Sequence, residues 1–131
     1  MLRIKLKHLA DWSEARRRNA AYYNQRLADI PGIVRPVEDP NAWAVYHLYV
    51  IHTQRRDELQ SFLAQKGIAT GLHYPQPLHL QAAYAHLGLQ EGAFPVVEAN
   101  ARRLLSLPMF AELTREQMDY VVDNIKAFFE K

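Results

Sequence analysis

The side chains best suited to chemistry gather in one short stretch of the sequence, GIATGLHYPQPLH. His73, Tyr74 and His79 can each donate and accept hydrogen bonds, and imidazole changes its charge near neutral pH. Pro75 and Pro77 fix backbone angles, which reduces the entropy lost when the stretch is held in one shape. The residue types alone leave two interpretations open: a loop that forms a binding or catalytic site, and a stiff turn whose aromatic side chains cover the core.

The six histidines do not have the spacing of a metal site. Two histidines that bind one metal from a helix lie three or four residues apart, and no pair in this sequence does. His47 and His52 are five residues apart across the end of a predicted strand, a spacing that points them to opposite faces. His73 and His79 have no acidic residue between them, and the chain has no cysteine. We therefore expect no metal site, no disulfide and no thiolate nucleophile.

Other catalytic patterns are equally weak. Ser13, Ser61 and Ser106 all lie outside the G-x-S-x-G pattern of a serine nucleophile. The glycines do not form the fingerprint of a dinucleotide or phosphate-binding loop. The sequence therefore predicts no catalytic residue from motif and spacing alone.

The one basic run is Arg16, Arg17 and Arg18, within a predicted helix. Asp11 and Glu14 lie within about one helical turn of it and dilute its positive field. The net charge is only +2, and no motif of stacking aromatic residues accompanies the run. We interpret the run as a solvated helix face and expect no nucleic-acid partner.

Hydrophobic periodicity and turn residues predict an alternating order of helices and strands. Thr114 and Gln117 form a capping box, the clearest helix start in the chain. Pro95 is suited to the first turn of another helix. The predicted helices cover about residues 6–27, 54–66, 80–88, 95–103 and 115–129, and the predicted strands cover residues 43–51, 68–74 and 104–107. This order predicts an α/β two-layer sandwich in which helices cover a small, mostly antiparallel sheet.

Length and composition are those of one globular domain spanning residues 1–131. Hydrophobic residues make up 49% of the chain and charged residues 23%, as in ordinary globular proteins. No apolar run approaches the roughly 20 residues that span a bilayer, and the N-terminus lacks the apolar stretch of a signal peptide. We expect a cytoplasmic protein without a membrane partner.

Four segments in a fixed order resemble a known family. They read LKHLADWSEARRRNAAYYNQRL, YHLYVI, GIATGLHYPQPLHLQAAY and FPVVEANARRLLSLPMFAELTREQMDYVVDNI. Together they are similar to the C-terminal, small domain of the DegT/DnrJ/StrS family of sugar aminotransferases, which depend on pyridoxal 5′-phosphate (PLP). The resemblance covers about residues 2–129, and its most specific parts are H-Y-P-x-P-L-H-x-Q and L-S-L-P-M-F.

The resemblance implies a unit of a fold-type I enzyme that is usually a homodimer. Such enzymes transfer an amino group to a keto group of a nucleotide-linked sugar, although some relatives catalyse dehydration or have regulatory roles. The small domain packs on a large domain and helps to close the active site. The helix over residues 6–27 corresponds to the segment that runs between the domains, so its broad apolar face predicts self-association or binding to a separate large domain.

The resemblance also implies that PLP chemistry lies outside this chain. The large domain carries the lysine that forms the Schiff base, and none of the lysines here lies in a matching motif; they are Lys5, Lys7, Lys66, Lys126 and Lys131. We expect no bound cofactor and no aminotransferase activity of this chain alone. The alternative is a stand-alone binding or protein-interaction module that has lost catalysis.

Residue by residue, the resemblance carries over to few positions. His73, Tyr74 and His79 match the loop that approaches the active site from the small domain. In an intact enzyme these residues would bind the nucleotide-linked sugar and would not carry out the transamination. His47 matches a histidine of the central strand and is interpreted as structural.

Overall fold

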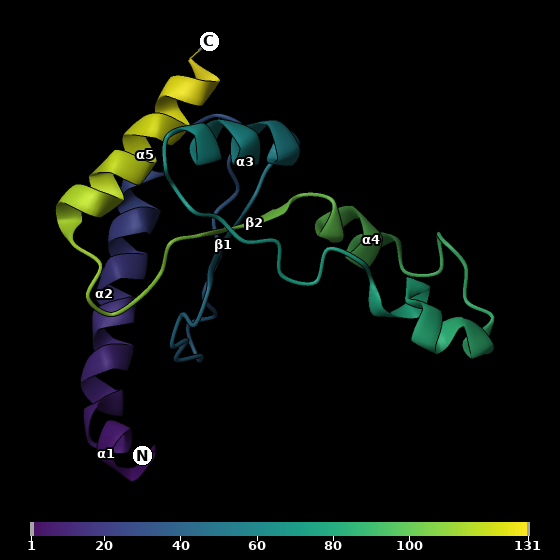
Figure 1. The fold of residues 1–131 in the computed structure, drawn as a ribbon, viewed down its shortest axis with the longest axis horizontal. Helices are drawn as coiled ribbons and strands as arrows, with labels where there is room; N and C mark the ends of the chain where they lie inside the picture. The colour runs from purple at the N-terminus through teal and green to yellow at the C-terminus, as the bar shows by residue number, and fades with distance from the viewer. Residues whose placement is uncertain (1, 131) are drawn as a thin grey trace.

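The structure is a computed structural model that describes residues 2–130. Figure 1 shows two long helices lying side by side, a small sheet beside them, and a lobe that extends away from both. The elements are α1 (Leu2–Lys5), η1 (Leu6–His8), α2 (Leu9–Arg26), β1 (Tyr49–His52), α3 (Arg56–Gln65), η2 (Leu78–Leu80), η3 (Ala82–Leu87), α4 (Pro95–Ala101), β2 (Leu104–Leu107) and α5 (Arg115–Phe129).

The sheet is antiparallel and small. β1 pairs with β2 in a register that places Tyr49 opposite Leu107, and single bridges add one residue at each edge. Val34 bridges to β1 and Gly71 bridges to Ser106 of β2. All of these pairings are antiparallel, which confirms the predicted α/β class with a mostly antiparallel sheet.

Two of the predicted strands are wrong in extent. The strand predicted for residues 43–51 begins only at Tyr49, because Tyr46 has a left-handed φ of 48° that a strand does not accommodate. The carbonyl oxygens of Tyr46 and His47 accept hydrogen bonds from Arg16. The strand predicted for residues 68–74 shrinks to the bridge at Gly71. His47 is exposed and lies outside β1. It is therefore not part of the central strand that the sequence predicted.

The helices α2, α3 and α5 build the core together with the sheet. α5 starts where the sequence predicts, because Thr114 and Gln117 form both hydrogen bonds of the capping box. Its buried side chains recur at helical spacing and pack against α2, α3 and β2. The largest fully buried side chains of the core are Tyr23, Tyr49, Leu27, Ile51, Leu59, Leu63, Leu105, Ile125 and Val122.

The lobe in Figure 1 is built differently, and we call residues 73–100 the arm. It contains η2, η3 and most of α4, which starts at Pro95 as predicted. The helix predicted near residues 80–88 is a 3₁₀ helix, and it ends at Gly88 with a left-handed φ of 66°. Throughout the arm, only His79 and Glu98 are buried.

The N-terminal turns project beyond the body of the molecule (Figure 1). The exposed apolar side chains there are Leu2, Ile4, Leu6 and Leu9. The predicted helix therefore exists and begins earlier than residue 6, with one 3₁₀ turn inside it. In the part of the chain that the structure describes, no helix has the length and apolar character needed to cross a membrane.

Candidate functional site

The candidate loop leaves the sheet at its edge. The N–H of Gly71 donates to the carbonyl of Ser106 at 3.0 Å, and the N–H of Ser106 donates to the carbonyl of Gly71 at 2.9 Å. This pair of hydrogen bonds fixes the start of the loop to β2. His73 follows only two residues later, so the edge of the sheet sets its position.

His73 folds back onto that bridge. Its Nδ1 lies 2.7 Å from the Oγ of Ser106, and Ser106 is buried. A Cβ placed on Gly71 would come within 2.7 Å of the Cε1 of His73, which is closer than real Cβ atoms approach. Gly71 is therefore required for the imidazole to lie where it does. The His73 residue as a whole is exposed.

Tyr74 projects into solvent. Its backbone has a left-handed φ of 57°, which is uncommon for a bulky residue. Conformations of this kind cost of order 1–3 kcal/mol and often occur where a side chain must be aimed. The side chain is 80% exposed, so the unusual backbone is not maintained by burial of the ring.

His79 faces the interior of the arm. Its Nε2 lies 2.9 Å from the Oε1 of Glu98, and its ring packs edge-on against Phe94 with centroids 4.9 Å apart. Both His79 and Glu98 are buried. The three predicted site residues therefore do not share one hydrogen-bonded cluster: His73 is tied to the sheet, Tyr74 is exposed, and His79 is tied to Glu98.

Glu98 organises the arm. Its carboxylate accepts hydrogen bonds from the backbone N–H of Gly92 at 2.8 Å and of Phe94 at 3.1 Å, in addition to its contact with His79. These interactions lower the pKa of Glu98; the N–H of Gly92 contributes most, and burial of the carboxylate opposes the shift. Glu98 is therefore ionised at neutral pH, and one carboxylate connects η2, the turn after η3 and α4.

The basic run is not a solvated helix face. Arg16 donates to the carbonyl oxygens of Tyr46, His47 and Met109 at 3.0–3.2 Å. The run therefore ties α2 to the segment before β1, which corrects the prediction made from its neighbours in sequence. Of the three arginines, only Arg18 is exposed.

Arg17 has a different partner in the same segment. Its guanidinium forms an ion pair with Glu38 at 2.7 Å and donates to the carbonyl of Ala44. The Arg17 hydrogen bond, supported by the Ala44 N–H and the Tyr46 hydroxyl, lowers the pKa of Glu38 to about 2. Neither Arg16 nor Arg17 is left without a protein partner, so neither supports a nucleic-acid interface.

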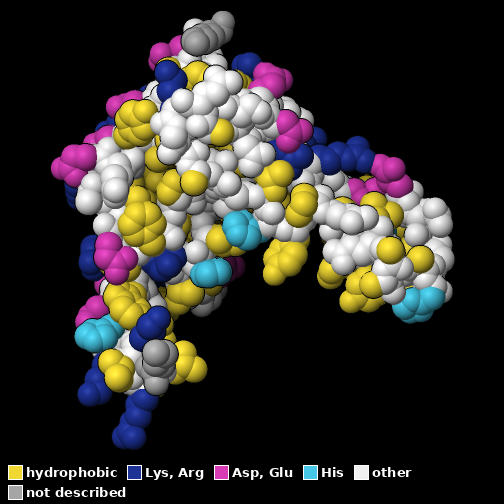
Figure 2. Space-filling view, in the orientation of Figure 1, with side chains coloured by type: hydrophobic (Ala, Val, Ile, Leu, Met, Phe, Trp, Pro, Cys, Tyr) yellow, Lys and Arg dark blue, Asp and Glu magenta, His cyan; other side chains and the backbone are white. Residues whose placement is uncertain are grey.

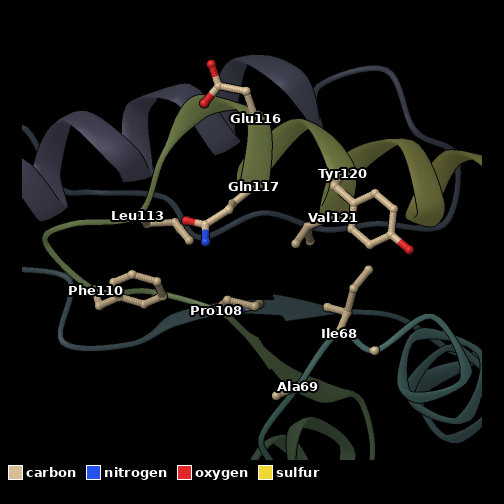
Figure 3. Close-up of a pocket in the computed structure, with 10 residues that line it drawn as sticks. Ile68, Ala69, Pro108, Phe110, Leu113, Glu116, Gln117, Tyr120 and Val121 are labelled. Carbon is tan, nitrogen blue, oxygen red and sulfur yellow. The ribbon is translucent and has the colours of Figure 1, made fainter.

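A hollow of about 380 Å³ lies near the loop, between the start of α5 and residues 67–69. Figure 3 shows Leu113 and Val121 on the α5 side of the hollow, and Phe110, Pro108 and Ile68 on the opposite side. The polar groups at its rim are engaged within the protein: the Tyr120 hydroxyl donates to the carbonyl of Lys66, and Gln117 belongs to the capping box. The hollow has no pair of converging ionisable groups that could do acid–base chemistry.

The described lysines do not fit a PLP site. A Schiff-base lysine must lose its proton, which enzymes achieve by burial or by a nearby charge. Lys5, Lys7 and Lys66 are exposed, and Lys126 is half-buried; Lys131 lies outside the described residues. Within residues 2–130, no group of three or more metal-ligating side chains has the geometry to bind a metal ion.

The candidate loop is thus anchored at the edge of the sheet of a small α/β sandwich. Residues 1–126 match the DegT/DnrJ/EryC1/StrS aminotransferase family. The chain belongs to this family.

Individual relatives agree along nearly the whole chain. It is 46% identical, over 97% of its length, to the erythromycin biosynthesis sensory transduction protein EryC1 of Saccharopolyspora erythraea, of which it covers 35%. It is 44% identical, over 100% of its length, to the dTDP-3-amino-3,4,6-trideoxy-alpha-D-glucose transaminase of Streptomyces venezuelae, again covering 35%. The chain thus spans about a third of the length of these relatives.

A solved structure has the same fold. The crystal structure of Streptomyces venezuelae DesV in complex with a ketimine intermediate superimposes with a TM-score of 0.95 at 45% identity. The match covers 99% of this chain and 35% of that one. The fold predicted from the sequence is confirmed by this likeness.

Two important residues escaped the sequence analysis. For Ser106 the available signal was its place in a predicted strand near the glycine of a neighbouring predicted strand, which is compatible with a cross-strand partner. Glu98 lies in the first turn of α4, where an acidic side chain can accept hydrogen bonds from preceding N–H groups. That position was the available signal for Glu98.

Proposed function

We propose that this chain is the C-terminal small domain of a PLP-dependent nucleotide-sugar aminotransferase. It contributes the loop on the substrate side of the active site and contacts to the large domain or to a second subunit. The observation that carries the proposal is a match to family members over nearly the whole chain, combined with a loop whose ring nitrogens and hydroxyl are presented from a rigid edge. A cytoplasmic location remains a prediction from the sequence.

The residues have different parts in this proposal. His73 and Tyr74 contact the nucleotide-linked sugar, because both are exposed and both follow closely on Gly71, which is bridged to β2. The resemblance groups His79 with them, but in this proposal His79 acts indirectly. Its ring is hydrogen-bonded to Glu98 and supports the shape of the arm. None of the three performs the amino transfer.

PLP is supplied with the large domain. It provides the electron sink for transamination when bound there, and this chain alone has no lysine in an environment that suits the Schiff base. The nucleotide sugar is the partner expected on the arm, since the Streptomyces venezuelae relative is named for a dTDP-linked sugar.

A domain exchange tests the proposal. The segment of the Streptomyces venezuelae transaminase that matches this chain is replaced by residues 1–131, and transamination is measured with its dTDP-sugar. We expect an active chimera, and we expect His73→Ala to raise KM more than it lowers kcat, because the side chain binds substrate in the ground state and in the transition state alike. A well-folded chimera without activity would contradict the proposal.

The exposed end of the first helix is the proposed contact for a large domain or for a second copy of the chain. A hollow there is lined by Leu2, Leu6, Leu9 and Trp12 together with Arg3 and Lys5, and its exposed surface is almost entirely apolar. Apolar surface of this kind favours association. Light scattering at increasing concentration is expected to show assemblies that Leu6→Glu and Leu9→Glu weaken, while the matched outer-face variant Gln25→Glu does not.

A stand-alone binding module is the second candidate. It is favoured by one observation: contacts within this chain alone order the arm, through Glu98, His79 and Ser106. Calorimetric titration of the isolated chain with a dTDP-sugar separates the two candidates. Binding that His73→Ala abolishes would favour the module, whereas no binding by the chain and activity of the chimera would favour the aminotransferase domain.

A further inference from the structure

Ser106 and His73 form a hydrogen bond in which either side chain could be the donor. The Oγ of Ser106 and the Nδ1 of His73 are 2.7 Å apart. In a neutral imidazole, a ring nitrogen either accepts a hydrogen bond or, when it carries the proton, donates one. The two possibilities leave opposite chemistry at the other ring nitrogen, Nε2. The direction of one hydrogen bond therefore decides what the loop offers to a ligand.

Burial of Ser106 favours one direction. The residue is only 4% exposed, and within residues 2–130 His73 is the one recorded side-chain hydrogen-bond partner of its hydroxyl. If Nδ1 carried the proton and donated to Oγ, the serine O–H would be left in a buried place without an acceptor. An unsatisfied buried donor costs about 1–3 kcal/mol. The serine O–H donates to Nδ1 instead, and the neutral ring carries its proton on Nε2.

The surroundings hold the ring in this orientation. Gly71 leaves the space that the Nδ1–Cε1 edge of the imidazole occupies, since an added Cβ would lie 2.7 Å from Cε1 and 3.2 Å from Nδ1. Two backbone hydrogen bonds join Gly71 to Ser106. The serine hydroxyl, the glycine and the ring are thus parts of one cross-strand unit. No partner is recorded for Nε2 among the described residues, and His73 is exposed.

We propose that Ser106 is a positioning residue that fixes His73 in the Nε2–H tautomer, so that the loop offers an N–H donor to an oxygen atom of the bound nucleotide sugar. The ligand in this statement rests on the proposed function; the tautomer does not. The Nε2–H of His73 can donate a hydrogen bond to an acceptor such as a diphosphate oxygen. It cannot accept one from a ligand hydroxyl.

The chain contains its own reference for the measurement. The Nδ1 of His86 lies 3.2 Å from the carbonyl oxygen of Ala83, and a carbonyl can only accept. His86 therefore donates from Nδ1, which is the tautomer opposite to the one proposed for His73. The two histidines should give opposite patterns in one spectrum.

Nitrogen NMR of the ¹⁵N-labelled 131-residue chain, without ligand, tests the inference. At a pH of about 8.5, above the ordinary imidazole pKa of about 6.5, correlations to the carbon-bound ring protons identify each nitrogen and show which one bears the proton. We expect the signal of an unprotonated Nδ1 for His73 and of a protonated Nδ1 for His86. A protonated Nδ1 in His73 of the unmodified chain would overturn the proposal, and this result needs no variant that folds.

Two substitutions show whether Ser106 is the cause. Ser106→Ala should move both His73 nitrogen signals toward the averaged values of a free imidazole, and Ser106→Thr should restore the original pattern because it keeps the hydroxyl. The His86 pattern should stay unchanged in both. An unaltered His73 pattern in Ser106→Ala would overturn the positioning role. An inactive chimera beside the expected tautomer would count against the proposed function alone, since the tautomer is measured without ligand.

Discussion

The core and the arm are stabilised in different ways. The core packs apolar side chains from three helices and a sheet until they are fully buried. The arm, residues 73–100, buries only His79 and Glu98 and takes its shape from hydrogen bonds to one carboxylate. Figure 2 shows the concave side between the N-terminal helix and the arm, along which hydrophobic and histidine side chains gather. The candidate loop thus has a defined shape without being part of the core.

This difference has a consequence for stability and function. Burial of apolar surface is cooperative and sets the free energy of unfolding of the whole domain. A local polar network can open without unfolding the rest. Substitutions in the core should therefore lower the free energy of unfolding, whereas substitutions in the polar network of the arm should change only the order of the loop.

The largest effect is expected in the core. Ile125→Ala removes a fully buried side chain between α5 and its neighbours and should lower the free energy of unfolding by about 2–5 kcal/mol. Its matched control is Val96→Ala in the arm, where the side chain is 72% exposed and the change should stay within about 0.5 kcal/mol. Urea denaturation followed by circular dichroism measures both; equal losses would refute the division into core and arm.

A smaller loss is expected where α2 holds the segment before β1. Arg16→Ala removes hydrogen bonds to three carbonyl oxygens and should cost about 1.5–3 kcal/mol, the range for hydrogen bonds that involve a charged group. Arg18→Ala, on the exposed side of the same run, should change the unfolding midpoint hardly at all. If both variants behaved alike, the run would be a solvated helix face after all.

Removal of the carboxylate should affect the arm alone. Glu98→Ala leaves the N–H groups of Gly92 and Phe94 and the ring of His79 without their acceptor. Hydrogen exchange at Gly92 and Phe94 should become faster by about tenfold or more, while amides of α5 keep their protection. Glu98→Gln retains one acceptor oxygen, so its exchange rates at Gly92 and Phe94 should lie between those of the unmodified chain and those of Glu98→Ala. Uniformly faster exchange across the domain would mean that the arm is part of the core's cooperative unit.

The smallest effect is a pH dependence of the same network. The Gly92 N–H, together with Phe94 and His79, lowers the pKa of Glu98. The ionised Glu98 carboxylate therefore contributes fully to the order of the arm above the ordinary glutamate pKa of about 4.3. This contribution is lost as the pH falls through the lowered pKa of Glu98 in the folded protein. The amide chemical shifts of Gly92 should show a transition below about pH 4.3 that is absent in Glu98→Gln. A midpoint above that value would contradict the network.

The sequence predicted the elements whose signals are local. The capping box of Thr114 and Gln117 and the helical spacing after it located α5, and Pro95 and Gly88 marked the ends of elements in the arm. These signals reside in neighbouring residues, so no tertiary information is needed to interpret them.

The misses all depend on contacts between distant residues. The strand predicted from residue 43 begins only at Tyr49, because Tyr46 has a left-handed backbone; the carbonyl of Tyr46 accepts a hydrogen bond from Arg16, thirty residues earlier. The pair of His79 and Glu98 spans nineteen positions, and it forms only once the arm has folded. Residue types identified the candidate loop around His73, but the partner that orients the ring lies on another strand.

The most direct test of the account is whether this chain needs a large domain to form a PLP Schiff base. The isolated chain and the chimera with the Streptomyces venezuelae large domain are each mixed with PLP and an amino donor, and the Schiff-base absorbance band is followed. We expect the band and amino transfer in the chimera and neither in the chain alone. A stable band in the isolated chain that disappears when one of its lysines is replaced would contradict the account.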